Sequence, residues 1–143
     1  MVEHILIPVD GSKPSEAALE FAVTNYPDTN ITALTVVDPG DLYSAGGIEG
    51  AMINYEDLME AHEGNAEKIL EEARAFASDH GVEIETDLVV GRVSRSIVEY
   101  IEDSDVDHVI IGSHGRTGAS RVLLGSVAET VTRRSPVPVT VVR

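Results

Sequence analysis

The segment from Gly112 to Ala128 collects the residue types that bind phosphate groups. It reads Gly-Ser-His-Gly-Arg-Thr-Gly-Ala-Ser over residues 112–120, and Gly125-Ser126 then opens a predicted helix. Glycines let the backbone approach an anion closely, and a helix start offers unpaired N–H groups at the positive end of its dipole. Arg116 adds a cation, and hydroxyl donors come from Ser113, Thr117, Ser120 and Ser126. The segment predicts a phosphate-binding loop; a flexible strand-to-helix connection is the alternative.

The familiar phosphate motifs do not fit this chain. No Walker string (Gly, four residues, Gly-Lys-Ser/Thr) is present, and the first turn, Asp10-Gly11-Ser12-Lys13, lacks the dinucleotide fingerprint. No catalytic residue is predicted. Adjacency of Ser113 and His114 does not position a base against a nucleophile, so His114 is interpreted as a hydrogen-bonding loop residue. The acid pairs Glu56-Asp57, Glu71-Glu72 and Glu102-Asp103 are interpreted as solvated helix surface.

The elements that must position this loop alternate along the chain. Apolar runs predict strands at 4–9, 30–37, 82–90, 108–111 and 137–142, and three- and four-residue spacing predicts helices at 12–25, 56–80, after Gly91 and at 125–134. This βαβ alternation predicts a single α/β domain over residues 1–143. We expect a three-layer αβα sandwich, Rossmann-like, with a five-stranded parallel sheet of order 3-2-1-4-5. The long 39–56 connection is predicted to be functional or disordered.

The predicted strand order places a switch point between the first and fourth strands. Ligands of open α/β sheets bind at the carboxyl ends of such strands. Asp10 ends the first strand and Gly112 ends the fourth. The two loops with the most unusual residues are therefore expected to meet in one crevice.

Charge and cysteine content exclude several classes of protein. Lys+Arg is 10 and Asp+Glu is 25, which gives a net charge of −15. Such acidity argues against binding to nucleic acid or to an anionic membrane. The absence of cysteine excludes disulfides and thiolate metal sites. Many acids, eight arginines and only Lys13 and Lys68 as lysines are typical of a halophilic, archaeal source; an acidic mesophilic protein is the alternative.

The N-terminus carries no sign of a targeting segment. It lacks a positively charged region and runs directly into a strand-like stretch. No apolar run approaches the roughly 18 residues that a membrane span needs. The sequence predicts a soluble, cytoplasmic protein.

The glycine pattern, with its flanks, resembles a known family. Gly112-x2-Gly115-x9-Gly125-Ser126 matches the ATP-binding pattern of the universal stress proteins, G-x2-G-x9-G-S/T. The opening strand and acidic turn at 5–12, the second strand at 34–38 and the closing strand at 135–142 resemble the family too. The resemblance covers essentially the whole chain, with the 39–56 loop as its variable part.

The resemblance implies an ATP-binding domain that forms homodimers through its last strand, Val137–Val142. It implies that Pro8 and Asp10 lie on the adenosine side and that the Val36 backbone contacts adenine. It further implies a shell around the ribose and phosphates made of Gly112, Ser113, His114, Gly115, Arg116, Thr117, Gly118, Gly125, Ser126, Val127 and Ala128. With no metal-ligand cluster in the sequence, Mg²⁺ or Mn²⁺ would be held mainly by the phosphates.

These features predict a stress-response regulator in which ATP orders the 112–125 loop. This ordering changes a surface that an unknown protein partner recognises. A module of the same fold that binds no nucleotide is the second interpretation, and a slow ATP hydrolase is the third. The charge distribution favours ATP: half of the ten cations lie between Gly112 and Arg143, against Glu129 as the one acid.

Overall fold

Five parallel strands form one sheet in the order β3-β2-β1-β4-β5. The computed structural model describes residues 2–41, 55–114 and 124–143. The strands are β1 (His4–Pro8), β2 (Asn30–Val37), β3 (Glu85–Val90), β4 (His108–Gly112) and β5 (Val139–Val142). The predicted parallel sheet and its 3-2-1-4-5 order are confirmed.

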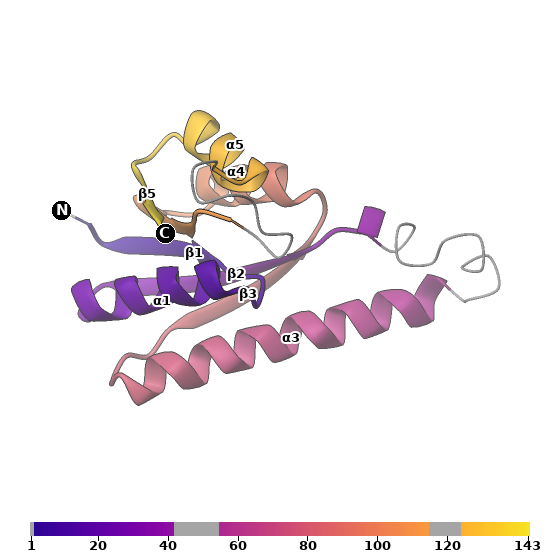
Figure 1. Cartoon of the computed structure of the whole chain (residues 1–143), viewed down its shortest axis with the longest axis horizontal. Helices are drawn as coiled ribbons and strands as arrows, with labels where there is room; N and C mark the ends of the chain where they lie inside the picture. The colour runs from indigo at the N-terminus through magenta and orange to yellow at the C-terminus, as the bar shows by residue number, and fades with distance from the viewer. Residues whose placement is uncertain (1, 42–54, 115–123) are drawn as a thin grey trace.

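Two pairs of helices cover the two faces of the sheet (Figure 1). α1 (Lys13–Asn25) and α3 (Tyr55–Asp79) pack on the face that carries Ile5 and Ile7. α4 (Val93–Asp103) and α5 (Ser126–Arg134) pack on the face that carries Leu6. Side chains of β1 alternate between the faces because successive residues of a strand point to opposite sides. The predicted αβα layers are confirmed.

Several predicted boundaries are wrong by one to three residues. The third strand begins at Glu85 instead of 82, because Val82 completes the end of α3 by donating from its N–H to the Ala77 carbonyl (2.9 Å). The last strand begins at Val139 instead of 137, because the Ser135 hydroxyl bonds to the backbone of Val137 and holds a turn there. Gly112 belongs to β4, and Gly125 is the N-cap of α5.

The connection after β2 is described only at its ends. Asp38 accepts a hydrogen bond from the Gly40 N–H (2.8 Å) at its Oδ1 atom, which is the turn chemistry expected there. Residues 42–54, most of the predicted 39–56 loop, lie outside the described part of the chain.

Helices on both faces reach the outer strand β3 with polar side chains. Arg74 of α3 donates to the Thr86 hydroxyl, and the Tyr100 hydroxyl of α4 donates to Asp87 Oδ2 (3.0 Å). Burial of the phenol, followed by its hydrogen bond to Asp87, raises the pKa of Tyr100 to about 12. The neutral phenol therefore holds α4 against the edge of the sheet over the physiological range.

We expect Tyr100 to ionise near pH 12 in the folded protein. Its folded pKa lies above the unfolded value of about 10, so its contribution to stability is present below pH 10 and is lost as the pH rises toward 12. Alkaline difference absorbance of the phenolate, compared between the wild type and Tyr100→Phe, measures this. The late-titrating phenol should be missing from the variant, and superimposable late phases would contradict the assignment.

Candidate functional site

Three predicted site residues, Asp10, Val36 and Ser113, lie at or just beyond the carboxyl ends of β1, β2 and β4. In the β1–β2 register Pro8 pairs with Leu34, and the Val9 N–H donates to the Leu34 carbonyl (2.8 Å). Continuing that register sets Asp10 beside Val36. In the β1–β4 register Leu6 pairs with Val109, and its continuation sets Asp10 beside Ser113. The ends of β2, β1 and β4 thus lie side by side at the predicted switch point, where the sequence places its ligand crevice.

Hydrogen bonds within the first turn fix the position of Asp10. Its Oδ1 atom accepts from the Ser12 N–H (2.9 Å), and its own N–H donates to the Ser15 hydroxyl (3.3 Å). The buried Ser15 hydroxyl donates in turn to the Ser12 carbonyl (3.0 Å). Gly11 has φ +80°, a left-handed conformation that suits glycine. Gly11 and Ser15 were not among the predicted site residues; the Asp-Gly-Ser turn was the signal for Gly11.

Gly112 is a glycine because another part of the chain approaches it closely. A Cβ atom at this position would lie 2.6 Å from both the carbonyl carbon and the carbonyl oxygen of Pro14. The first turn of α1 therefore packs directly on the end of β4. The sequence predicted that Gly112 lets the backbone approach an anion. In the structure, the group that lies close to Gly112 is Pro14.

Gly125 closes the base of the loop between β4 and α5. Its N–H donates to the Ser113 carbonyl (2.7 Å), and a Cβ would lie 2.9 Å from that same oxygen. The prediction that the Gly125 N–H is free for phosphate is therefore wrong. Within the described ranges, the N–H groups of Ser126, Val127 and Ala128 have no acceptor, and no side chain caps the helix. These three groups form the positive end of the α5 dipole.

Ser113 and His114 form the described floor of this loop. Ser113 is buried, and its N–H donates to the Val142 carbonyl of β5 (2.8 Å). Ser113 Oγ and His114 Nδ1 are 3.1 Å apart, within hydrogen-bond reach, although adjacency alone did not predict it. His114 Nε2 is buried and has no hydrogen-bond partner among the described residues. Among the described residues, no third group orients the imidazole as a nucleophile–base pair would require.

Comparison with known proteins places this architecture in a family. The model of the universal stress protein family matches residues 1–143. The chain belongs to the universal stress protein family. It is 32% identical to universal stress protein MJ0531 of Methanocaldococcus jannaschii, over 100% of this chain and 83% of the relative.

Solved structures of universal stress proteins agree with this assignment. The structure of MJ0577 from the same organism superimposes with a TM-score of 0.83 at 31% identity, over 99% of this chain and 96% of that chain. A universal stress protein solved in complex with cAMP superimposes with a TM-score of 0.69 at 25% identity, over 99% of this chain and 97% of that one. The family fold and this chain's fold are the same.

The described residues of the universal stress protein pattern gather at one edge of the sheet, around the crevice. Half-buried Pro8 ends β1, half-buried Val36 lies near the end of β2, and Gly125 to Ala128 open α5. Four predicted residues lie in the 115–123 segment, outside the described part of the chain: Gly115, Arg116, Thr117 and Gly118.

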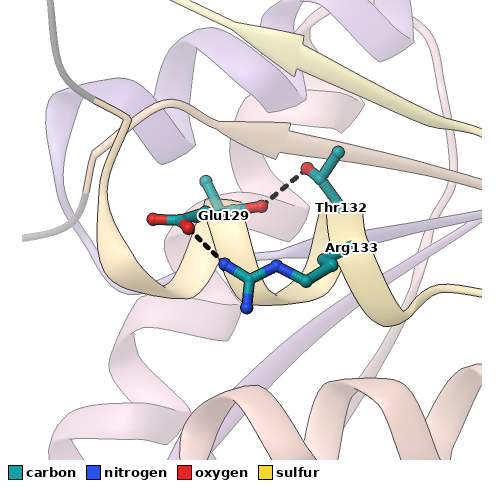
Figure 2. Close-up of polar contacts among 4 residues, drawn as sticks. Glu129, Thr132 and Arg133 are labelled. Carbon is teal, nitrogen blue, oxygen red and sulfur yellow. Dashed lines mark hydrogen bonds and ion pairs between the residues drawn. The ribbon is translucent and has the colours of Figure 1, made fainter.

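Two of the five C-terminal cations, Arg133 and Arg134, lie away from the start of α5, while Arg116 and Arg121 lie outside the described part of the chain. Arg133 pairs with Glu129 on the exposed side of α5, one turn apart, and Thr132 bonds back to the Ala128 carbonyl (Figure 2). Arg133 and Arg134 lie in the last turn of α5, roughly 12 Å along the axis from its start. Arg143 was not a predicted site residue, yet the β4–β5 register sets it level with Ser113.

The described ranges hold neither a metal-ligand cluster nor a membrane-spanning helix. Residues 2–41, 55–114 and 124–143 contain no group of three or more His, Asp or Glu side chains that could hold a metal ion. No helix in these ranges is both long and apolar enough to cross a bilayer. All six residues of the acid pairs 56–57, 71–72 and 102–103 are exposed, as predicted.

A small, mainly apolar cavity lies between α1 and α3 and borders the Asp10 turn through Gly11 and Ser15. Its volume is about 110 Å³, and its walls include Val9, Leu19, Ile69, Ala73 and Phe76. A cavity of this size holds a molecule no larger than benzene. It is too small for a nucleotide, whose sites run to several hundred Å³.

Proposed function

We propose that this protein is an ATP-binding regulator of a stress response. The observation that carries the proposal is that the neighbouring ends of β1, β2 and β4 bring Asp10, Val36 and Ser113 to one edge of the sheet, with the uncapped start of α5 bonded to Ser113. A helix N-terminus at the carboxyl edge of a parallel sheet suits an anionic ligand. The similarity to a universal stress protein in complex with cAMP supports an adenine nucleotide.

Each part of the crevice has a role in this proposal. Pro8, Asp10 and Val36 hold the adenosine, with the Val36 backbone against the adenine ring. The loop from Gly112 through Gly118 and the N–H groups of Ser126, Val127 and Ala128 surround the ribose and phosphates. Mg²⁺ or Mn²⁺, when present, is held mainly by the phosphates because the described residues offer no ligand cluster.

Regulation follows from the base of the loop in this proposal. The hydrogen bond from the Gly125 N–H to the Ser113 carbonyl (2.7 Å) joins the two ends of the 112–125 segment. ATP orders this segment and so changes the surface that a protein partner recognises. Slow hydrolysis of the bound ATP is the third interpretation that the sequence offered, and the described residues supply no evident base to activate water for it.

The experiment is to release ligand from the purified protein by heat and to identify it by ion-exchange chromatography. We expect an adenine nucleotide at a substantial fraction of one per chain, or calorimetric binding of ATP by protein that has been stripped. Titration with GTP and with inorganic triphosphate separates recognition of the base from recognition of phosphate. Protein that carries no nucleotide and gives no heat with ATP would contradict the proposal and favour an interaction module.

We also propose that the protein pairs through β5 as a homodimer. The Val109 N–H donates to Pro138, and the Ser113 N–H donates to Val142. Even-numbered residues of β5 therefore face β4, and the N–H groups of Val139 and Val141 point to the open side. In the described chain neither N–H has an acceptor. Antiparallel pairing with a second copy satisfies both edges and gives a closed twofold assembly.

The acid-rich surface supports a salt-loaded cellular environment, which we also propose. On α3 alone the exposed carboxylates are Glu56, Asp57, Glu60, Glu67, Glu71, Glu72 and Asp79. Salt screens the repulsion among such groups and so favours the compact state.

A further inference from the structure

The open side of β3 presents a row of backbone groups like that of β5. The Gly91 N–H donates to the Val37 carbonyl of β2 (2.9 Å), so the odd-numbered residues of this strand face β2. Hydrogen bonding alternates along a parallel strand, and the N–H groups of Thr86, Leu88 and Val90 therefore point away from the sheet. Val90 is 48% exposed. An open edge of this kind is a template for pairing with another strand.

Asp87 covers the middle of that row with its own side chain. Its Oδ1 atom accepts from the outward Leu88 N–H (2.9 Å). Its Oδ2 atom accepts from the Tyr100 hydroxyl (3.0 Å), which holds the carboxylate in place from α4. An incoming strand would have to displace a bonded, charged group in order to reach the Leu88 N–H. On β5, the outward N–H groups of Val139 and Val141 have no such cover among the described residues.

We propose that Asp87, held by Tyr100, is a guard that keeps a second copy of this chain from pairing along the β3 edge. The occupant excluded is β3 of another copy, because two identical edges can pair antiparallel about a twofold axis. With both outer strands open, β5 pairing and β3 pairing would alternate and build an unending sheet. With β3 guarded, assembly stops once β5 is paired.

The test compares Asp87→Ala with Glu85→Ala by sedimentation velocity at high KCl over a range of protein concentrations. Both changes remove one carboxylate from β3, but the Glu85 N–H faces β2, so only Asp87→Ala uncovers an outward donor. We expect an apparent association constant at least about tenfold higher for Asp87→Ala than for Glu85→Ala. Equal association of the two variants would overturn the proposal.

Amide hydrogen exchange of residues 85–91 locates the new contact. In associated Asp87→Ala protein, the amides of Thr86, Leu88 and Val90 should gain protection relative to Glu85→Ala. Association without protection there would place the contact elsewhere and would also overturn the proposal.

Tyr100→Phe provides a second route if Asp87→Ala does not fold. It keeps the charge and the ring but frees the carboxylate, and we expect a smaller rise in association with the same protected amides. No rise in Tyr100→Phe, with Asp87→Ala unfolded, would count against the guard. A monomeric wild type in the same experiment would contradict β5 pairing without touching the guard, since the two edges are independent.

Discussion

Gly112→Ala is expected to lower the free energy of unfolding by about 2 kcal/mol, within the range of overpacking changes in a filled core. The added methyl group would lie 2.6 Å from the Pro14 carbonyl carbon and oxygen, and both are backbone atoms that a rotamer change cannot move. Relief requires the first turn of α1 to shift away from β4. That shift would also displace the Asp10 turn, so ATP affinity should fall together with stability.

Urea denaturation measures the first effect, and calorimetric titration with ATP measures the second. Gly64→Ala is the matched control, because a Cβ at Gly64, on the exposed surface of α3, meets nothing within 4 Å. It should be neutral or stabilising by up to about 1 kcal/mol, since alanine favours a helix interior over glycine. Equal stability of the two variants would show that α1 does not press on Gly112 in this way.

Gly125→Val is expected to reduce ATP affinity by about 100-fold, which corresponds to roughly 2.7 kcal/mol. The valine Cβ would lie 2.9 Å from the Ser113 oxygen and 3.1 Å from His114 Cα. The hydrogen bond that closes the loop would have to lengthen, and the uncapped N–H groups of α5 would move relative to Ser113. The sheet and its two cores do not depend on this contact, so the protein should still fold.

Calorimetry with ATP, paired with circular dichroism, measures the effect on protein shown to be folded. Gly64→Val makes the same change of side chain on the exposed surface of α3 and should leave ATP affinity unchanged. Gly125→Ala should fall between the two, because it adds one methyl group in place of three carbons. Wild-type affinity in folded Gly125→Val would remove this loop from the binding site.

The sheet order could be predicted because the chain alternates cleanly between apolar runs and helical spacing. The start of β3 could not, because Val82 and Ile84 are buried and apolar and so read as strand residues, although Val82 ends α3. The start of β5 could not be predicted either, because Val137 is apolar although the strand begins only at Val139. An apolar pattern reports burial, whereas a strand is defined by its hydrogen bonds.

The place of the crevice could also be predicted, but the reasons for its glycines could not. The sequence marks Gly112 as unusual without naming its neighbour, because Pro14 lies almost a hundred residues away along the chain. The Gly125 N–H looked free because its acceptor, Ser113, lies across a loop. The five C-terminal cations looked like one group, yet α5 carries Arg133 and Arg134 to its far end.

Ser113 joins the outer strand β5 to the start of α5 by hydrogen bonds, in addition to the apolar packing between these two elements. Its N–H is bonded to β5, and its carbonyl is bonded to Gly125 at the start of α5. The base of the loop and the open edge of the sheet therefore share the residue Ser113. For the proposed ATP-binding dimer, thermodynamic linkage requires that the factor by which ATP strengthens self-association equals the factor by which self-association strengthens ATP binding. The apparent affinity for ATP would accordingly depend on the concentration of the protein itself. The amount of this protein in the cell would then affect how strongly it responds to ATP.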